Sequence, residues 1–161
     1  MLHLTENSSV VIIGPPGSGK TFVGHLLAEQ SGLPLYSTDE FLKNDAVQAL
    51  YAVMQFTGDK GFILEGMVGY RWLRKRRQLK LPPPDIVIQL DATDRQIEES
   101  YRKRKKRVSL ERIKVFCRSH ETILSDYYAL DGDEPKVWIH SDSPHIAHLI
   151  GGGPAGAAPK D

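Results

Sequence analysis

A glycine-rich stretch near the amino end of the chain constrains its fold more than any other feature. Residues 14–21 read GPPGSGKT and match the pattern G-x-x-x-x-G-K-[ST] at every fixed position. The four residues before it, 10–13, form a β-branched run typical of a buried parallel strand. Residues 19–30 have the apolar spacing of a helix, and Gly32 follows its predicted end. The sequence therefore predicts a strand, a glycine loop and a helix in direct succession.

A loop of this kind binds phosphate groups. Gly17 and Gly19 leave room for successive backbone N–H groups to point toward an anion, and the helix that follows adds a partial positive charge. We predict that Lys20 contacts the β- and γ-phosphates of ATP and that Thr21 is the ligand of Mg²⁺. ATP and Mg²⁺ are therefore the predicted cofactors. The predicted ATP-binding residues are Gly14, Pro15, Pro16, Gly17, Ser18, Gly19, Lys20 and Thr21.

The rest of the chain alternates between short apolar runs and helical stretches. Further strands are predicted at residues 33–36, 61–65, 85–90 and 136–140. Helices are predicted at 37–56, 69–79, from 91 onward, at 109–129 and at 144–150. Strands separated by helices favour a parallel sheet covered on both faces, so we predict one α/β domain over residues 1–150. Residues 151–161, rich in Gly, Ala and Pro, are predicted to form a flexible tail.

The basic residues are concentrated in one part of the chain. The formal net charge is +1, but residues 71–118 hold 16 Lys and Arg against 6 Asp and Glu. Two dense clusters, 74–77 and 102–107, account for most of that excess. One interpretation is a set of solvated helix faces. The other is a surface for a polyanionic partner, so nucleic acid is a candidate partner of the region 71–118.

Composition excludes several other classes of protein. No apolar run reaches the roughly 18–20 residues that a membrane span needs, and no secretory signal is visible, so we predict no membrane partner. Cys117 is the single cysteine, which excludes an internal disulfide and favours a reducing compartment. We expect a cytoplasmic location, which would also suit a phage-encoded protein acting in its host.

The chain resembles the nucleoside monophosphate kinases, of which adenylate kinase is the best-known member. Besides the glycine loop, the resemblance is carried in order by YSTDEFL at 36–42, GFILEG at 61–66, PDIVIQLDA at 84–92 and the helical stretch 112–128. It implies a three-layer P-loop NTPase fold with a five-stranded parallel sheet. The implied strand order is 2-3-1-4-5, with ligands at the carboxyl ends of the strands and a small basic lid.

The same resemblance implies roles for individual residues. Arg112 matches the arginine of the helix after the lid, and Arg104 matches an arginine ahead of the lid. Both are candidate catalytic residues together with Lys20, and Arg107 is a candidate ATP contact. On the acceptor side the candidates are Asp39, Glu65 and Arg71. For Glu65 two other roles stay open: it could orient the water shell of Mg²⁺, or simply end a strand.

The acceptor side also departs from that family. Only residues 41–60 separate the second and third predicted strands, which leaves no room for a large acceptor-binding insertion. The arginine expected after Asp39 is absent, and the first arginine after Glu65 is Arg71. A shortened acceptor region beside a strongly basic half favours an acceptor larger than a free nucleotide. For a hydroxyl acceptor, Asp39 would serve as the general base and hence as a catalytic residue.

Three functions follow from these observations. The first is a kinase that transfers the γ-phosphoryl group of ATP to a nucleoside- or nucleotide-type acceptor. The second is a nucleic-acid hydroxyl kinase, either a phage-type kinase of 5-hydroxymethyluracil in DNA or a polynucleotide 5′-kinase. The third is a P-loop ATPase that acts without an acceptor.

Overall fold

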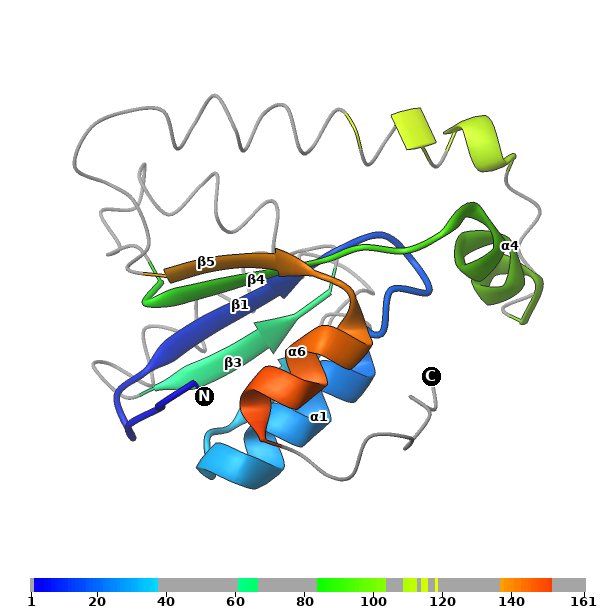
Figure 1. The fold of residues 1–161 in the computed structure, drawn as a ribbon. Helices are drawn as coiled ribbons and strands as arrows, with labels where there is room; N and C mark the ends of the chain where they lie inside the picture. The colour runs from blue at the N-terminus through cyan, green and yellow to red at the C-terminus, as the bar shows by residue number, and fades with distance from the viewer. Residues whose placement is uncertain are drawn as a thin grey trace, which may run out of the picture.

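The computed structural model contains one five-stranded sheet (Figure 1). Its strands are β1 (Ser9–Ile13), β2 (Leu35–Ser37), β3 (Phe62–Glu65), β4 (Ile86–Leu90) and β5 (Val137–Ser141). All are parallel, in the order β2-β3-β1-β4-β5, which confirms the predicted topology. The structure describes residues 2–37, 61–66, 84–103, 109–112, 114–115, 118 and 137–151.

Strand β1 lies at the centre of the sheet and is buried on both sides. Val11 pairs with Leu64 of β3 and with Val87 of β4, and all three side chains have no exposed surface. Residues 10–13 are likewise all at 0% exposure. Such a run needs cover on both faces of the sheet, because successive side chains point to opposite sides. The β-branched run before the glycine loop is therefore the centre of the core, as its sequence predicts.

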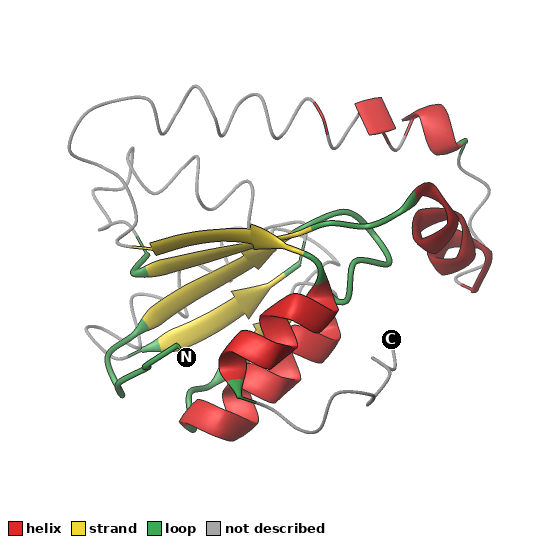
Figure 2. Ribbon diagram, viewed as in Figure 1, coloured by secondary structure: helices red, strands yellow, loops and turns green. Residues whose placement is uncertain are grey.

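Two helices cover one face of this sheet. Helix α1 (Lys20–Ser31) and helix α6 (Ser143–Ile150) lie side by side (Figure 2). Leu27 of α1 and Ile146 of α6 pack with Ile12, Ile63 and Ile88 of the sheet in one hydrophobic cluster. This packing fixes the first turn of α1 directly above the carboxyl end of β1, where the glycine loop lies.

Helix α1 ends as the sequence predicts. Gly32 adopts a left-handed conformation with φ 74°, and its N–H donates to the carbonyl of Ala28. The strand that follows is shifted, since β2 covers Leu35–Ser37 instead of 33–36. The assignment of Ser37 to a helix entry is wrong, because Ser37 pairs in register with Glu65 as the last residue of β2. The predicted helices at 37–56 and 69–79 otherwise lie outside the described residues.

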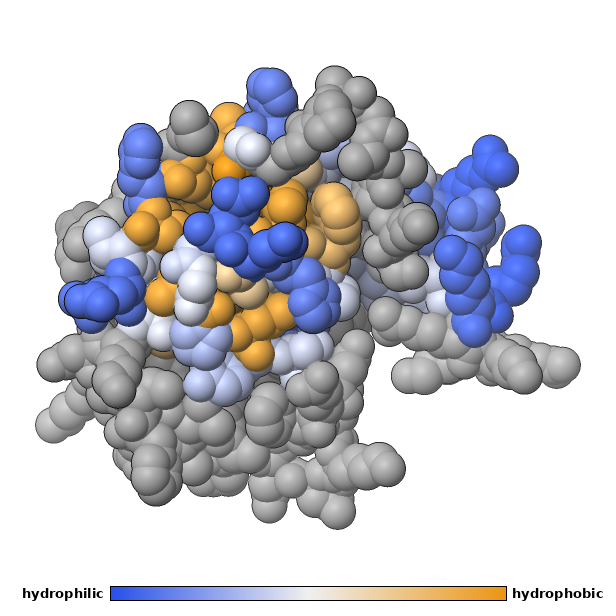
Figure 3. Space-filling view, turned by 90° about the horizontal axis from the view of Figure 1, so that it is seen from below, coloured by the Kyte–Doolittle hydropathy of each residue, from blue (hydrophilic) through white to orange (hydrophobic). Residues whose placement is uncertain are grey.

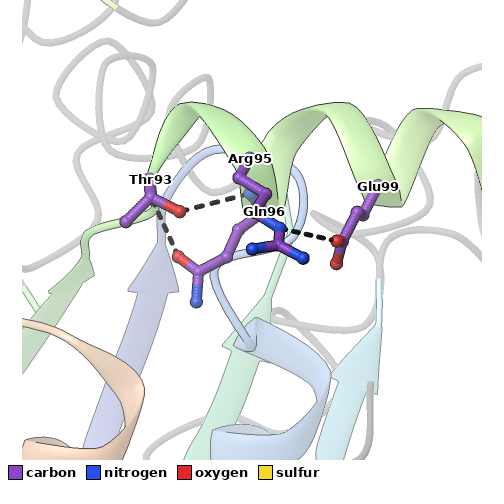
Figure 4. Close-up of polar contacts among 4 residues, drawn as sticks. All are labelled: Thr93, Arg95, Gln96 and Glu99. Atoms are coloured by element: carbon purple, nitrogen blue, oxygen red, sulfur yellow. Dashed lines mark hydrogen bonds and ion pairs between the residues drawn. The ribbon is translucent and has the colours of Figure 1, made fainter.

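Helix α4 (Asp94–Lys103) starts three residues later than the predicted residue 91, and a capping box fixes its start (Figure 4). The Thr93 N–H donates to the Gln96 side-chain oxygen at 2.8 Å, and the Gln96 N–H donates to the Thr93 hydroxyl at 3.2 Å. These reciprocal bonds satisfy amides that the first helical turn leaves free. An ion pair between Arg95 and Glu99, four residues apart, follows on the exposed surface.

Helix α4 is joined to the helical residues after it by a small second cluster. Leu110, Ala92 and Tyr101 pack against the buried Ile97, in a cluster separate from the main core. Residues 110–112, 114–115 and 118 are helical, which agrees with the predicted helix at 109–129 where the structure describes it. Its start is capped by Ser109, whose hydroxyl accepts the N–H of Arg112 at 3.3 Å.

The described surface is mixed in polarity. Seen from below, hydrophilic and apolar side chains are interspersed (Figure 3). The exposed large hydrophobic residues of the described ranges are Val115 and Val137. Within those same ranges, no helix has the length and apolar character needed to span a bilayer.

Candidate functional site

The glycine loop connects the carboxyl end of β1 to the first turn of α1. Gly17 and Gly19 both lie in the left-handed region, with φ 81° and φ 90°, and Gly19 is the N-cap of α1. A residue with a Cβ is strained in this conformation. The two glycines therefore allow the sharp turn that joins the carboxyl end of β1 to the amino end of α1, whose free amides can bind an anion.

Helix α4 closes over the tip of this loop. A Cβ added to Gly17 would lie 2.4 Å from the backbone oxygen of Gln96 and 3.1 Å from Cβ of Ser100. Both contacts come from α4, so the loop and the helix approach too closely for any side chain at position 17. Glycine is therefore required at position 17 for two independent reasons: the left-handed backbone conformation and the close approach of α4.

Lys20 lies back across the loop that precedes it. Its Nζ donates to the carbonyl oxygens of Gly14 at 2.8 Å and Pro15 at 3.0 Å. The ammonium group is thereby held at the mouth of the loop, beside the amides of the first helical turn. A positive charge in this place is what a phosphate chain entering the loop would meet.

The hydroxyl of Thr21 faces a buried carboxylate. Its Oγ1 donates a long hydrogen bond of 3.5 Å to Oε1 of Glu65, the last residue of β3. The hydroxyl of Ser37, at the end of β2, donates to the same oxygen. Glu65 is only 2% exposed. Three elements thus bring two hydroxyls and one carboxylate together at the carboxyl edge of the sheet.

These groups fit the predicted cofactors. Hydroxyl and carboxylate oxygens are the donors that Mg²⁺ prefers, so Thr21 and Glu65 are suitable residues to hold the ion and its water. The hydroxyl of Ser18 is buried and has no hydrogen-bond partner within the part of the chain that the structure describes. A buried hydroxyl without a partner is costly, and a phosphate oxygen in the loop would satisfy it.

Of the other predicted site residues, only Arg112 lies within the described ranges. Arg112 is exposed in the first turn of the helix after Ser109. Asp39, Arg71, Arg104 and Arg107 lie outside the described residues, so their predicted roles stay predictions. No group of three or more His, Cys, Asp or Glu side chains capable of holding a metal occurs among the described residues.

Sequence reasoning missed two members of this site. The approach of α4 to Gly17 had a partial signal, because Thr93 and Gln96 form the T-x-x-Q pattern of a capping box. The role of Ser37 had none. Its partner Glu65 is 28 residues away in sequence, and only the pairing of β2 with β3 brings the two together.

No family model matches the chain. Among curated proteins it is similar to shikimate kinases. It is 41% identical to that of Symbiobacterium thermophilum over 54 residues, which cover 34% of this chain and 31% of the relative. With the shikimate kinase of Photobacterium profundum it shares 23% identity over 123 residues, covering 66% of this chain and 70% of the relative. The chain thus spans about a third of the length of the more identical relative.

Solved structures extend this similarity over the whole fold. A shikimate kinase from Acinetobacter baumannii in complex with shikimate superposes with a TM-score of 0.60 at 16% identity, covering 89% of both chains. A gluconokinase from Sinorhizobium meliloti 1021 gives a TM-score of 0.55 at 13% identity, covering 91% of this chain and 89% of the other. The chain has the fold of the P-loop kinases. The finer resemblance to nucleoside monophosphate kinases stays a prediction.

Proposed function

We propose that this protein is an ATP-dependent kinase that transfers the γ-phosphoryl group of ATP to a hydroxyl group of a small acceptor. One observation carries the proposal: Lys20, Thr21 and Glu65 converge at the mouth of a glycine loop formed at the carboxyl edge of a parallel sheet. Phosphoryl transfer asks mainly for positioning and for positive charge around the phosphate oxygens. The loop amides, the amino end of α1 and the Lys20 ammonium supply both.

Each residue has a distinct part in this proposal. The amides of residues 17–21 hold the phosphate chain, and Lys20 exchanges its loop carbonyls for phosphate oxygens. Thr21 and Glu65 hold the magnesium ion and its water. Bound Mg²⁺ would neutralise charge on the phosphates. Asp39, which follows β2, would accept the proton of the acceptor hydroxyl. Arg104, Arg107 and Arg112 remain candidates for the cationic shell.

The small-molecule acceptor is supported by the names of the similar proteins. Shikimate kinases and a gluconokinase phosphorylate small hydroxylated compounds, as their names state. A nucleoside acceptor is the second candidate. A deoxyadenosine kinase from M. mycoides superposes with a TM-score of 0.50 at 13% identity, covering 89% of this chain and 94% of the other. The nucleoside- or nucleotide-type acceptor predicted from the sequence therefore stays a candidate.

Nucleic acid is a weaker candidate for the acceptor. Of the two basic clusters that suggested it, residues 74–77 and 104–107 lie outside the described residues. The similar proteins named above are kinases of small molecules, and they offer no support for phosphorylation of DNA.

Transfer of label from γ-³²P-ATP tests the function directly. The acceptor panel contains shikimate, gluconate, deoxynucleosides, nucleoside monophosphates and hydroxymethylated DNA. We expect labelling of one small hydroxyl compound, dependent on Mg²⁺ and absent in Lys20→Ala. Hydrolysis of ATP at the same rate with and without every acceptor would instead indicate an ATPase. Labelling of DNA alone would contradict the small-molecule acceptor.

A further inference from the structure

The carboxylate of Glu65 occupies an unusual position for a negative charge. It ends the buried strand β3, with 2% of its surface exposed, and both hydrogen bonds that it accepts from described residues come from hydroxyl groups. A hydroxyl compensates a buried charge only in part, because it brings a dipole and no opposite charge. Glu65 is therefore arranged to interact with a cation, and the described side chains that touch it do not provide one.

The direction of the Thr21 hydroxyl indicates where that cation belongs. Because a carboxylate only accepts, the Thr21 hydroxyl is the donor in its 3.5 Å contact with Glu65 Oε1, which leaves its oxygen lone pairs available to another partner. Thr21 is exposed, and it stands in the first turn of α1 next to Lys20. A hydroxyl that donates to a carboxylate is oriented to offer its oxygen to a metal, which is how partners behind a metal ligand act in general.

Ser37, at the end of β2, is the second hydroxyl that contacts the Glu65 carboxylate. Its hydroxyl donates to the same oxygen, Oε1, that receives the Thr21 proton. The second oxygen, Oε2, accepts no hydrogen bond from the described residues. A carboxylate fixed through one oxygen cannot rotate freely, so Ser37 determines where the other oxygen lies and in which direction Thr21 donates.

We propose that Ser37 is a positioning residue for the divalent cation that accompanies the nucleotide. It acts through Glu65: the serine fixes the carboxylate, and the carboxylate orients the Thr21 hydroxyl and the water of the ion. The inference rests on the proposed function, because the ion would arrive with ATP. It goes further in assigning to β2, which otherwise leads toward the acceptor side, a part in metal affinity.

The test measures metal affinity separately from catalysis. ADP binding is measured by calorimetry in EDTA and in Mn²⁺, and free Mn²⁺ in the ternary mixture is measured by electron paramagnetic resonance. For Ser37→Ala we expect Mn²⁺ affinity of the ADP complex to fall about tenfold, as for other residues behind a metal ligand. ADP affinity in EDTA should stay within about twofold of the wild type, a free-energy change well below that of a tenfold loss. Ser37→Thr keeps the hydroxyl and should restore Mn²⁺ affinity.

Ser9→Ala is the matched control. The hydroxyl of Ser9 also donates to a carboxylate, that of Asp85 just before β4, but where the strands start instead of where they end. It should leave Mn²⁺ affinity unchanged. If Ser37→Ala does not fold, Ser37→Cys takes its place, because a thiol keeps the size of the side chain but is a weaker hydrogen-bond donor than a hydroxyl. It should lower Mn²⁺ affinity with unchanged ADP affinity in EDTA.

Three results would overturn the inference. Wild-type Mn²⁺ affinity in Ser37→Ala would show that the serine does not position the carboxylate. An equal loss of ADP affinity with and without metal would show a structural role in the loop. Failure of the wild-type protein to bind any nucleotide would remove the proposed function as well, whereas the first two results leave that function standing.

Discussion

A serine is paired with a carboxylate both where the strands of the sheet start (the amino edge) and where they end (the carboxyl edge). The two pairs differ in the groups that surround them. At the amino edge, the N–H of Ser9 donates to Asp85 Oδ2 at 3.0 Å, and the N–H of Asp85 donates back to the Ser9 hydroxyl at 2.9 Å. At the carboxyl ends of the strands, Glu65 accepts hydrogen bonds from the hydroxyls of Ser37 and Thr21. The first pair uses backbone amides, and the second uses only side chains.

This difference separates structure from function. The reciprocal bonds satisfy the amide of Ser9, the first residue of β1, and that of Asp85, the residue before β4, so the pair ties two strand starts together. Among the described residues, no amide donates a hydrogen bond to the Glu65 carboxylate, and at 2% exposure Glu65 is far more buried than a glutamate usually is. Parallel sheets bind ligands at their carboxyl edge, which is where the costly arrangement is found.

Loss of the Lys20 ammonium should have the largest effect on the carboxyl edge. Lys20→Ala removes the charge held over the loop by Gly14 and Pro15, and we expect the transfer rate to fall at least about 1,000-fold. The rate is measured by γ-³²P transfer, and folding is checked by thermal melting. Glu29→Ala, an exposed change on the same helix, serves as the control. Retention of more than a tenth of the activity in Lys20→Ala would contradict the proposed role.

Replacement of Asp39 tests whether a hydroxyl is the group attacked. If Asp39 is the general base, Asp39→Asn should lower the rate constant for turnover about 100-fold while leaving ATP affinity unchanged. Steady-state kinetics with the identified acceptor measure this, and ATP binding is followed by calorimetry. Full activity in Asp39→Asn would remove the general-base role and would favour an acceptor that is already ionised.

Two glycines, one in the loop before α1 and one just after its last residue, test whether backbone strain alone or the contact with α4 affects nucleotide binding. Gly17→Ala should weaken ADP binding at least about tenfold, because the new Cβ would lie 2.4 Å from Gln96 O and α4 or the loop must move. Gly32 has a similar φ of +74°, yet nothing lies within 4 Å of its would-be Cβ. Gly32→Ala should therefore cost about 1 kcal/mol of stability from backbone strain and leave ADP affinity unchanged.

Calorimetry of ADP binding and thermal melting distinguish these two variants. Equal ADP affinities in Gly17→Ala and Gly32→Ala would indicate that the close approach of α4 has no bearing on nucleotide binding.

The smallest effect is expected at the amino edge. Asp85→Asn removes the charge that the Ser9 amide and hydroxyl face, and it should lower the free energy of unfolding by about 1 kcal/mol. Metal affinity and transfer rate should not change. Urea unfolding followed by circular dichroism measures the first, and the Mn²⁺ titration of the ADP complex measures the second. A change of Mn²⁺ affinity in Asp85→Asn would contradict the assignment of metal binding to the Ser37–Glu65 pair and of a purely structural role to the Ser9–Asp85 pair.

Local patterns were sufficient for most elements that the structure describes. The β-branched run at 10–13 and the apolar runs near 62 and 86 became the central strands, because such runs are stable only when covered on both faces. Gly32 ends α1 as predicted, since glycine adopts the left-handed turn at little cost. The resemblance to known kinases supplied the strand order, which periodicity does not contain.

Strand boundaries were predicted less well where propensities are ambiguous. The apolar run at 33–36 predicts a strand that includes Leu33 and Pro34, although β2 starts at Leu35. The sequence from residue 37 predicts the start of a helix, with Ser37 or Thr38 as its cap. The pairing of Ser37 with Glu65 of β3 overrides that local preference.

The sequence by itself determined the phosphate-binding loop, since glycines at 17 and 19, the lysine and the threonine act on neighbours a few residues away. The tertiary structure alone decided which carboxylate Thr21 faces, that Ser37 shares it, and that α4 lies against Gly17. The physical reason is the separation along the sequence of the groups that interact. Backbone conformation and helix termini depend on adjacent residues, whereas these contacts join groups 28 to 79 positions apart that meet only when the parallel strands align their carboxyl ends.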